Sequence, residues 1–228
     1  MSRTLFIGDI HGCVYTLKAL LKQLQPTQDD YLYFLGDYIN RGPDSKGVID
    51  TIITLKDEFP NTVTLTGNHE QLLINDYIAE TEKGWHNMAD EEFTSSFNIK
   101  NLKQLPKQYI EFCKTLPFYH EDPNFIAVHA GLNFEDTNPL ASKEHLIWIR
   151  NWYHNIDYKW LGDKVIIHGH TPLTIQEIEA QFSNYKNTQV LNIDCGVFMH
   201  EQKAHGLGYL CAFDFTNEKL YFQENLDC

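Results

Sequence analysis

A strand-and-turn unit that occurs three times near the start of the chain constrains its fold most. Each unit is a short apolar segment that runs into a glycine and then a polar residue able to bind metal. The units are Thr4–Ile7 before Gly8-Asp9, Tyr31–Leu35 before Gly36-Asp37, and Thr62–Leu65 before Gly67-Asn68. Helical spacing of apolar residues follows each unit, over Val14–Leu24, Val48–Phe59 and about Glu70–Ile78. This β-α-β-α-β start predicts parallel strands with covering helices and an α/β fold.

The rest of the chain adds shorter elements to this start. We expect a helix over Lys107–Leu116 and strands over Phe125–Val128, Val165–Ile167, Val190–Ile193 and Tyr209–Phe215. No linker composition or internal repeat separates these segments, so we expect one domain over residues 1–228. Residues 80–116 are expected to form a cap-like helical insertion. Within it, the stretch from Trp85 to Phe97 is expected to cover the cleft and influence substrate choice.

Metal-capable side chains follow several of the expected strands. They are Asp9 and His11, Asp37, Asn68, His129, and His170. Because the carboxyl ends of strands form the ligand crevice of open α/β sheets, these residues should converge. Each motif alone has a plainer explanation: Gly-Asp is common in turns, and Asn68 could simply cap a helix. A mixed carboxylate, imidazole and amide set favours two divalent ions, with Mn first and Fe or Zn as alternatives, over Mg or Ca.

Charge and cysteine content limit the partners and the compartment. Lys and Arg total 18 against 31 Asp and Glu, which gives a net charge of −13. An acidic surface repels phosphate backbones, so we expect no nucleic-acid partner. Five scattered cysteines indicate reduced thiols and a cytoplasmic location. No segment is apolar enough to cross a membrane, so we expect no membrane association, and we expect a monomer.

Five motifs in this order resemble those of a known family. They are GDIHG (8–12), GDYINRGP (36–43), GNHE (67–70), HAG (129–131) and GHT (169–171). The pattern resembles calcineurin-like metallophosphoesterases of the phosphoprotein-phosphatase type, and the WIR segment (148–150) looks most like bacterial and phage members. The resemblance runs from residue 5 to about residue 215. It implies a sandwich-like mixed β core flanked by helices, and hydrolysis of phosphoesters.

The same resemblance assigns roles to individual residues. Asp9, His11 and Asp37 would hold one metal, and Asp37 would bridge to a second held by Asn68, His129 and His170. A hydroxide between the ions would attack phosphorus. Arg41 and Arg150, together with Asn68, would bind the phosphate, because guanidinium suits paired phosphate oxygens. His69 would protonate the leaving oxygen. His168 is expected to pack beside the site.

One residue departs from the family pattern. Asn40 stands where the family usually has the Asp that orients the His69 position and stabilises its charged form. An amide accepts a hydrogen bond but brings no charge. We therefore predict reduced or acid-shifted activity, and we expect Asn40→Asp to change the turnover or the pH–rate profile. Cys13 is expected to pack as a small residue, and His200 and His205 are expected to be exposed.

Three hypotheses for function remain open at this point. The first is a phosphatase acting on phosphoserine, phosphothreonine or phosphotyrosine in proteins, which the modest length of the chain favours. The second is hydrolysis of dinucleoside tetraphosphates, an activity of a related bacterial branch; small phosphoesters are possible substrates in either case. The third is a phosphate-binding regulatory module with a weakened site, supported by Asn40 alone.

Overall fold

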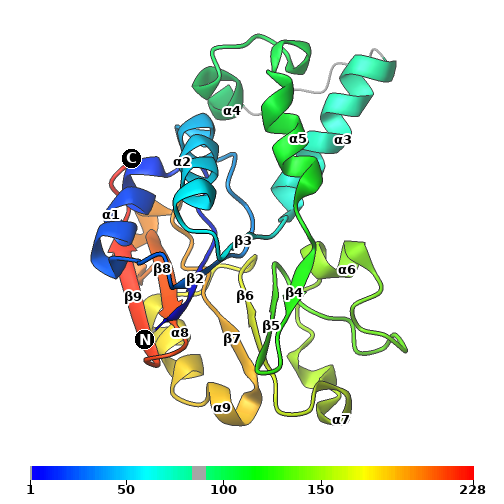
Figure 1. Cartoon of the computed structure of the whole chain (residues 1–228), viewed down its shortest axis with the longest axis vertical. Coiled ribbons are helices and arrows are strands. Elements are labelled where there is room, and N and C mark those ends of the chain that lie inside the picture. Colours follow the sequence, from blue (N-terminus) through cyan, green and yellow to red (C-terminus); the bar gives the residue numbers. More distant parts are fainter. Residues whose placement is uncertain (1, 84–90) are drawn as a thin grey trace.

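The structure is a computed structural model that describes residues 2–83 and 91–228, and its strands form two mixed sheets (Figure 1). Sheet A has the order β3-β2-β1-β8-β9 and sheet B the order β4-β5-β6-β7. The strands are β1 (Thr4–Ile7), β2 (Tyr31–Phe34), β3 (Thr62–Thr64), β4 (Tyr119–Glu121), β5 (Phe125–Val128), β6 (Val165–His168), β7 (Val190–Asn192), β8 (Tyr209–Asp214) and β9 (Lys219–Glu224). Strands β1–β3 are parallel, as are β5–β7, and the remaining pairings are antiparallel. The predicted mixed α/β core is confirmed.

Alternating side chains of the strands divide the core into layers. In β1, Phe6 packs between the two sheets, whereas Leu5 and Ile7 face the helices outside sheet A. In β5, Ala127 packs between the sheets and Ile126 faces the outer side of sheet B. Because successive side chains of a strand point to opposite faces, each central strand contributes to two apolar layers. This explains why these strands are continuous apolar runs.

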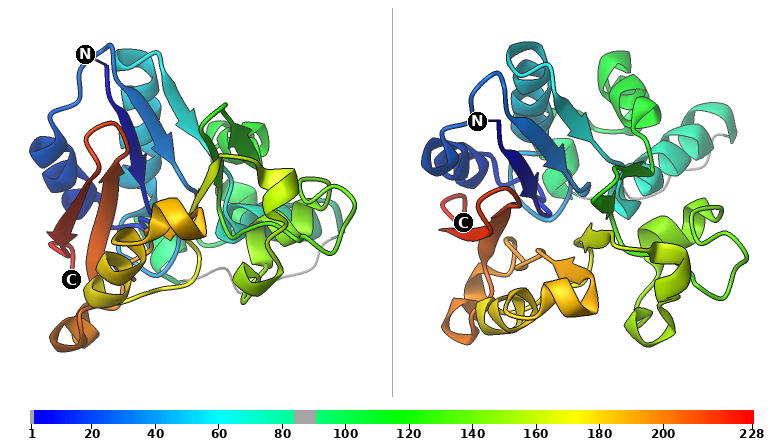
Figure 2. Two further views of the ribbon diagram at one scale, coloured as in Figure 1. Left: turned by 90° about the horizontal axis from the view of Figure 1, so that it is seen from below. Right: turned by 60° about the horizontal axis from the view of Figure 1, so that its bottom comes forward.

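Helices and short helical turns cover the sheets. The helices are α1 (Val14–Leu24), α2 (Ser45–Glu58), α3 (Asn68–Lys83), α4 (Glu91–Ser96), α5 (Lys107–Thr115), α6 (Lys143–Trp148), α7 (Tyr158–Leu161), α8 (Ile175–Phe182) and α9 (Tyr185–Thr188). Helices α1 and α2 pack on the outer face of sheet A, and α8 and α9 lie against β7 (Figure 2). Helix α2 begins three residues before the predicted start because the Asp44 side chain accepts the Gly47 N–H at 2.7 Å.

Helices α3, α4 and α5 stand together at one end of the molecule, at the top of Figure 1. The predicted helix over Lys107–Leu116 is confirmed as α5, and α4 was not predicted. Residues 84–90, part of the stretch expected to cover the cleft, lie outside the described residues. Within the described ranges, no helix is both long enough and apolar enough to cross a membrane. All five cysteines have free thiols, and Cys13 is buried as expected.

Candidate metal centre

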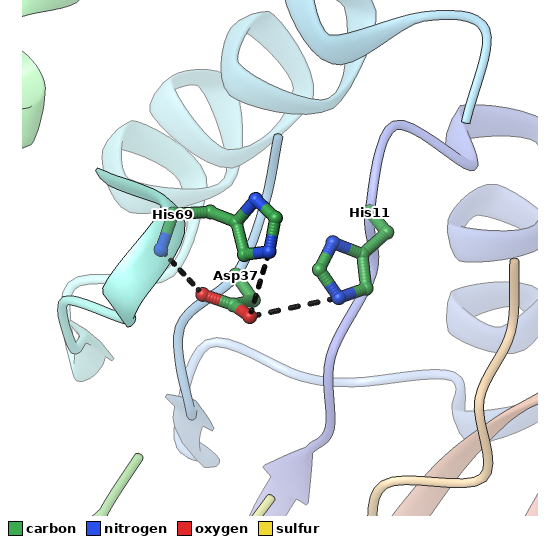
Figure 3. A group of neighbouring side chains, drawn as sticks. All are labelled: His11, Asp37 and His69. Carbon is green, nitrogen blue, oxygen red and sulfur yellow. Dashed lines mark hydrogen bonds and ion pairs between the residues drawn. The ribbon is translucent and has the colours of Figure 1, made fainter. Parts of the chain in front are cut away.

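Asp37, directly after β2, lies at the centre of the predicted cluster. Its Oδ2 is 3.5 Å from His11 Nε2 and 4.0 Å from His69 Nε2 (Figure 3). On the other side, its Oδ1 is 3.5 Å from His129 Nε2. The side chains come from loops after β1, β2 and β5 and from the first turn of α3. The ends of strands in both sheets therefore meet at one carboxylate, as the strand-end argument predicted.

The clustered donors form two groups that share Asp37. The first contains His11, Asp37 and His69, and the second contains Asp37, His129 and His170. Within each group, the ligand atoms lie within 4.8 Å of one another. Asn68 joins the second group, since its Oδ1 is 3.0 Å from both His129 Nε2 and His170 Nδ1. Asp9 lies beside this group, where its carboxylate accepts the His170 backbone N–H at 3.1 Å.

The hydrogen bonds of the histidine rings direct lone pairs into the cluster. His11 Nδ1 is 3.0 Å from Ile39 O, and His129 Nδ1 is 2.9 Å from Leu35 O. Because a carbonyl can only accept, both Nδ1 atoms carry the proton and both Nε2 atoms present a lone pair. The lone pair of His129 Nε2 then faces the Asn68 carbonyl oxygen, also an acceptor. The clustered donors fit a cation, which would turn this repulsion into shared coordination.

A second sign of a fit is the buried His170 Nε2, which has no hydrogen-bond partner among the described residues. An unpaired polar atom inside a protein is unfavourable unless something binds it. Burial also lowers the pKa of His170 to about 2 and that of His129 to about 3, so both rings are neutral and able to bind metal at pH 7.

The carboxylates of the cluster have raised pKa values, in contrast to the lowered pKa values of the histidines. Burial, followed by the nearby charges of Asp194 and Asp37, raises the pKa of Asp9 well above its usual value. Burial also raises the pKa of Asp37, and that of Asp194 to about 7. Several acidic groups buried together without a compensating cation repel one another. Bound divalent ions would supply that positive charge and keep the carboxylates ionised.

Glu70 fixes the loops that carry the ligands, a role that the sequence did not reveal. Its fully buried carboxylate accepts three backbone N–H groups, from Asp37, Tyr38 and Gly67, each at 2.9 Å. These bonds tie the loop after β2 to the loop before α3. The side chain therefore sets the distance between Asp37 and Asn68 without lying in the cluster itself.

The backbone of the cluster is unusual. Ten described non-glycine residues have positive φ, and five of these are predicted site residues: His11, Asp37, Asn40, Arg41 and His170, with φ between 44° and 72°. The left-handed backbone conformation is unfavourable for non-glycine residues, and it is found most often at functional sites. Half of these unusual conformations thus fall on residues that the motifs had singled out.

A cavity of about 300 Å³ opens beside the clustered donors. Arg41 and Arg150 line it together with Asn68 and His69, so the four residues expected to contact substrate share one space. The Arg41 guanidinium lies 4.3 Å from the centre of the Phe198 ring, and Arg150 Nη1 donates to Thr171 Oγ1 at 2.9 Å. Asn40 is half-buried and its backbone N–H donates to Ser45 Oγ at 2.9 Å. The effect of Asn40 on His69 stays a prediction.

Comparison with known proteins gives this arrangement a family. The profile of the calcineurin-like phosphoesterases matches residues 2–208. The chain belongs to this family. Its members are phosphoester hydrolases and typically bind two divalent metals, which agrees with two donor groups joined by Asp37.

The relatives carry related names. A symmetrical bis(5'-nucleosyl)-tetraphosphatase of Buchnera aphidicola (Schizaphis graminum) is 32% identical over 168 residues, 68% of this chain and 58% of the relative. An asymmetrical bis(5'-nucleosyl)-tetraphosphatase, PrpE of Anoxybacillus flavithermus, is 26% identical over 83% of this chain and 84% of the relative. A solved structure provisionally described as a diadenosine tetraphosphatase has a TM-score of 0.68 at 20% identity, covering 100% of this chain and 95% of that one. This chain spans 58% of the length of the symmetrical Buchnera relatives.

Several residues at the cavity were not predicted. Asp194 and Phe198 follow β7, and Trp148 ends α6. Asp194 could have been found, because it follows an apolar strand and precedes Gly196, the signal used for the other strand ends. Phe198 carries no such signal, since an aromatic residue in a loop is usually part of the core. Trp148 belongs to the WIR segment (148–150), but no role was predicted for it.

Other histidines lie away from the donors. His168 is buried, and its Nε2 is 2.7 Å from the Tyr153 hydroxyl, so His170 and not His168 joins the cluster. His200 and His205 are exposed in the 3-10 helix His200–His205, as expected.

Proposed function

We propose that this chain is a two-metal phosphoester hydrolase, with Asp37 as the ligand shared by both ions. The observation that carries the proposal is the meeting of two donor groups at this single carboxylate. Asp9, His11 and Asp37 would hold one ion, and Asp37, Asn68, His129 and His170 the other. Two ions held in this way would act together on the attacking and leaving oxygens of one phosphate. Carboxylate, imidazole and amide ligands favour Mn, with Fe or Zn as alternatives.

The bound ions would lower the pKa of water and polarise the phosphate. Residues of the chain would do the rest of the work. Arg41 and Arg150, which line the same cavity, would hold phosphate oxygens and offset their negative charge. Asn68 would add an amide contact to the phosphate. His69 lines the same cavity, and its Nε2 would give a proton to the leaving oxygen.

For the substrate, the names of the relatives support dinucleoside tetraphosphates over phosphoproteins. Both curated relatives described above carry dinucleoside tetraphosphatase names, and one of them is a protein of which this chain spans 84%. A modest chain length therefore does not favour the phosphoprotein hypothesis as the sequence alone suggested. That hypothesis stays as the second candidate. The net negative charge of the chain would repel either anionic substrate. The arginines of the cavity, together with bound ions, would attract it locally.

The test is a metal add-back with three substrates. Protein stripped of metal receives Mn, Fe, Zn or Mg and is assayed on p-nitrophenyl phosphate, a phosphopeptide and diadenosine tetraphosphate. We expect metal-dependent turnover of the first substrate and preference for the dinucleotide over the phosphopeptide. A preference for the phosphopeptide would support the second candidate. Absence of turnover with every metal would leave the phosphate-binding module and contradict the hydrolase.

A further inference from the structure

A second cavity, of about 340 Å³, lies next to the cavity of the clustered donors, on the outer face of sheet B. The register of β6 and β7 determines which residues form its floor. Ile166 of β6 and Val190 of β7 face outward, and two residues further on each strand the paired residues His168 and Asn192 face the same way. The outer face of the sheet thus changes from apolar to polar at the carboxyl ends of its strands, where the cavity opens.

Arg150 joins the two cavities, because it lines both of them. Its Nη1 donates to Thr171 Oγ1 at 2.9 Å, and Asn192 Nδ2 donates to the Thr171 carbonyl at 2.8 Å. The guanidinium is therefore anchored to the cavity floor through one of its donors, and its other N–H groups can contact an anion. A ligand with one phosphate among the clustered donors would pass Arg150 on its way into the second cavity.

An aromatic wall stands over this floor. The Tyr153 side chain is 38% exposed, yet its hydroxyl lies 2.7 Å from His168 Nε2. Since His168 Nδ1 is 3.0 Å from the Gly169 carbonyl, His168 Nε2 accepts and the Tyr153 hydroxyl donates. Trp152 packs edge-on against the Tyr153 ring at 4.8 Å. The ring is thus fixed in place with part of its surface open, which suits stacking of a flat ligand.

Charge in this cavity differs from charge in the chain as a whole. Among the described residues that line it, none is Asp or Glu, although the chain carries a net charge of −13. Arg150 supplies positive charge at its inner end, and the side-chain amides of Asn151 and Gln181 add donors and acceptors. An exposed aromatic ring beside amides is a combination that binds nucleobases, because rings stack on bases and amides pair with base edges.

We propose that this second cavity is the nucleoside subsite of the enzyme: it holds the base and ribose of one half of a dinucleoside polyphosphate while Arg150 contacts the intervening phosphate. This inference rests on the proposed function and deepens it. The Tyr153 ring would stack on the base, and Arg150 would link recognition of the nucleoside to the phosphate under attack. A phosphotyrosine peptide could also use an aromatic wall, but it has no need of the amide pair or of a second phosphate contact.

The test uses two matched variants, Tyr153→Phe and Tyr153→Leu. Both lose the hydroxyl that contacts His168, and only the second loses the aromatic ring. For diadenosine tetraphosphate we expect Tyr153→Leu to lower kcat/KM by about 10- to 100-fold, mainly through KM, since stacking contributes about 1–3 kcal/mol per base. Tyr153→Phe should stay within about threefold of wild type on the same scale. On p-nitrophenyl phosphate, both variants should match wild type.

Tyr119→Ala is the control, because Tyr119 has a similar exposure of 37% on the edge strand β4 and lines neither cavity. It should leave both substrates unaffected. Equal values for wild type and Tyr153→Leu on the dinucleotide would overturn the subsite, as would an equal loss on both substrates. Sensitivity of a phosphotyrosine peptide alone would also overturn it. Wild-type protein that hydrolyses p-nitrophenyl phosphate but not the dinucleotide would overturn the proposed substrate, and the subsite with it.

A measurement on wild-type protein keeps the inference testable if Tyr153→Leu does not fold. ADP and inorganic pyrophosphate both present a diphosphate, and only ADP carries a nucleoside on it. As inhibitors of p-nitrophenyl phosphate hydrolysis, we expect ADP to be at least about 10-fold more potent, the ratio that one stacked base provides. Equal potency of the two inhibitors would contradict a nucleoside subsite.

Discussion

The two sheets supply the same site but differ on their outer faces. In β1 and β2 of sheet A, the outward residues stay apolar to the end of the strand, as Ile7 and Phe34 show, and they pack in the core beneath α1 and α2. In sheet B, the outward residues change from Ile166 and Val190 to the polar pair His168 and Asn192. The outer face of sheet A is closed by core packing, whereas the outer face of sheet B ends in a cavity.

The difference suggests a division of roles: both sheets supply the reacting groups, and the outer face of sheet B influences which substrate is chosen. The loops after sheet A strands bring the carboxylates Asp9 and Asp37, and the loops after β5 and β6 bring the imidazoles His129 and His170. Both sheets contribute to the donor groups. Among the described residues, sheet B continues past these groups into a second cavity, so changes there should affect one substrate more than another.

Replacing the shared carboxylate should abolish the chemistry whatever the substrate. For Asp37→Asn we expect kcat/KM to fall by roughly 10³-fold on both p-nitrophenyl phosphate and the dinucleotide, as for loss of a main electrostatic group. Steady-state kinetics at saturating Mn will measure this. The exposed Asp29→Asn is the matched control. A loss confined to one substrate would contradict the division between the sheets.

Glu70→Gln should weaken metal binding indirectly, because Glu70 holds the loops that carry the ligands. The amide keeps one acceptor oxygen in place of the two that now take three backbone N–H groups. We expect metal affinity to fall by about 10- to 100-fold, the usual effect of losing a group that orients ligands. Equilibrium titration of stripped protein with Mn will measure it. Unchanged affinity, in a variant with lowered unfolding stability, would limit Glu70 to a structural role.

The two arginines should differ in their dependence on substrate. Lysine keeps the charge but loses paired donation to phosphate oxygens. We expect Arg41→Lys to raise KM by about 10-fold for both p-nitrophenyl phosphate and the dinucleotide, since one charge-assisted hydrogen bond is lost. Arg150→Lys should raise KM further for the dinucleotide than for p-nitrophenyl phosphate, because Arg150 also lines the second cavity. Identical substrate profiles for the two variants would remove this distinction.

The floor of the sheet B cavity should also affect stability through pH. Burial lowers the pKa of His168 to about 3, below the usual 6.5, so the unfolded chain binds this proton more readily than the folded protein between these values. The contribution of His168 to stability is therefore full above pH 6.5 and falls as the pH falls toward 3. Between pH 7.5 and 5.5, wild type should lose about 1.4 kcal/mol more than His168→Gln.

Urea unfolding of both proteins at the two pH values will measure that difference. Metal-free protein should be used, so that release of ions does not contribute. Equal losses for wild type and His168→Gln would mean that His168 does not stay neutral inside the fold, and the hydrogen bond from Tyr153 would then need another explanation.

The strands of both sheets could largely be predicted from sequence, except β4 and β9, but the helices beside sheet A were predicted better than those beside sheet B. The strand Thr4–Ile7 and the helix Val14–Leu24 were predicted with correct bounds, because Gly8 follows the strand, and helical spacing followed by Pro26 marks the helix. The short helices α6 to α9 were missed. They span eight residues or fewer, too few for helical periodicity to be visible, and they form because they pack on sheet B.

The residues of the site also differ in how well the sequence predicted them. Its motif residues could be placed together in advance, since the ends of parallel strands converge whatever the details of packing. Glu70 lies within a motif, but its three backbone contacts depend on two loops that only the fold brings together. Tyr153 and Gln181 are far apart in the sequence and carry no motif, so their shared cavity could not be predicted.

Metal stoichiometry shows whether two ions share Asp37. Protein stripped of metal is titrated with Mn, and bound metal per chain is counted by mass spectrometry beside the activity of the same samples. We predict two ions per wild-type chain, activity that appears only as the second ion binds, and fewer than two ions on Asp37→Asn. Full activity with one ion, or two tightly held ions on Asp37→Asn, would contradict the account.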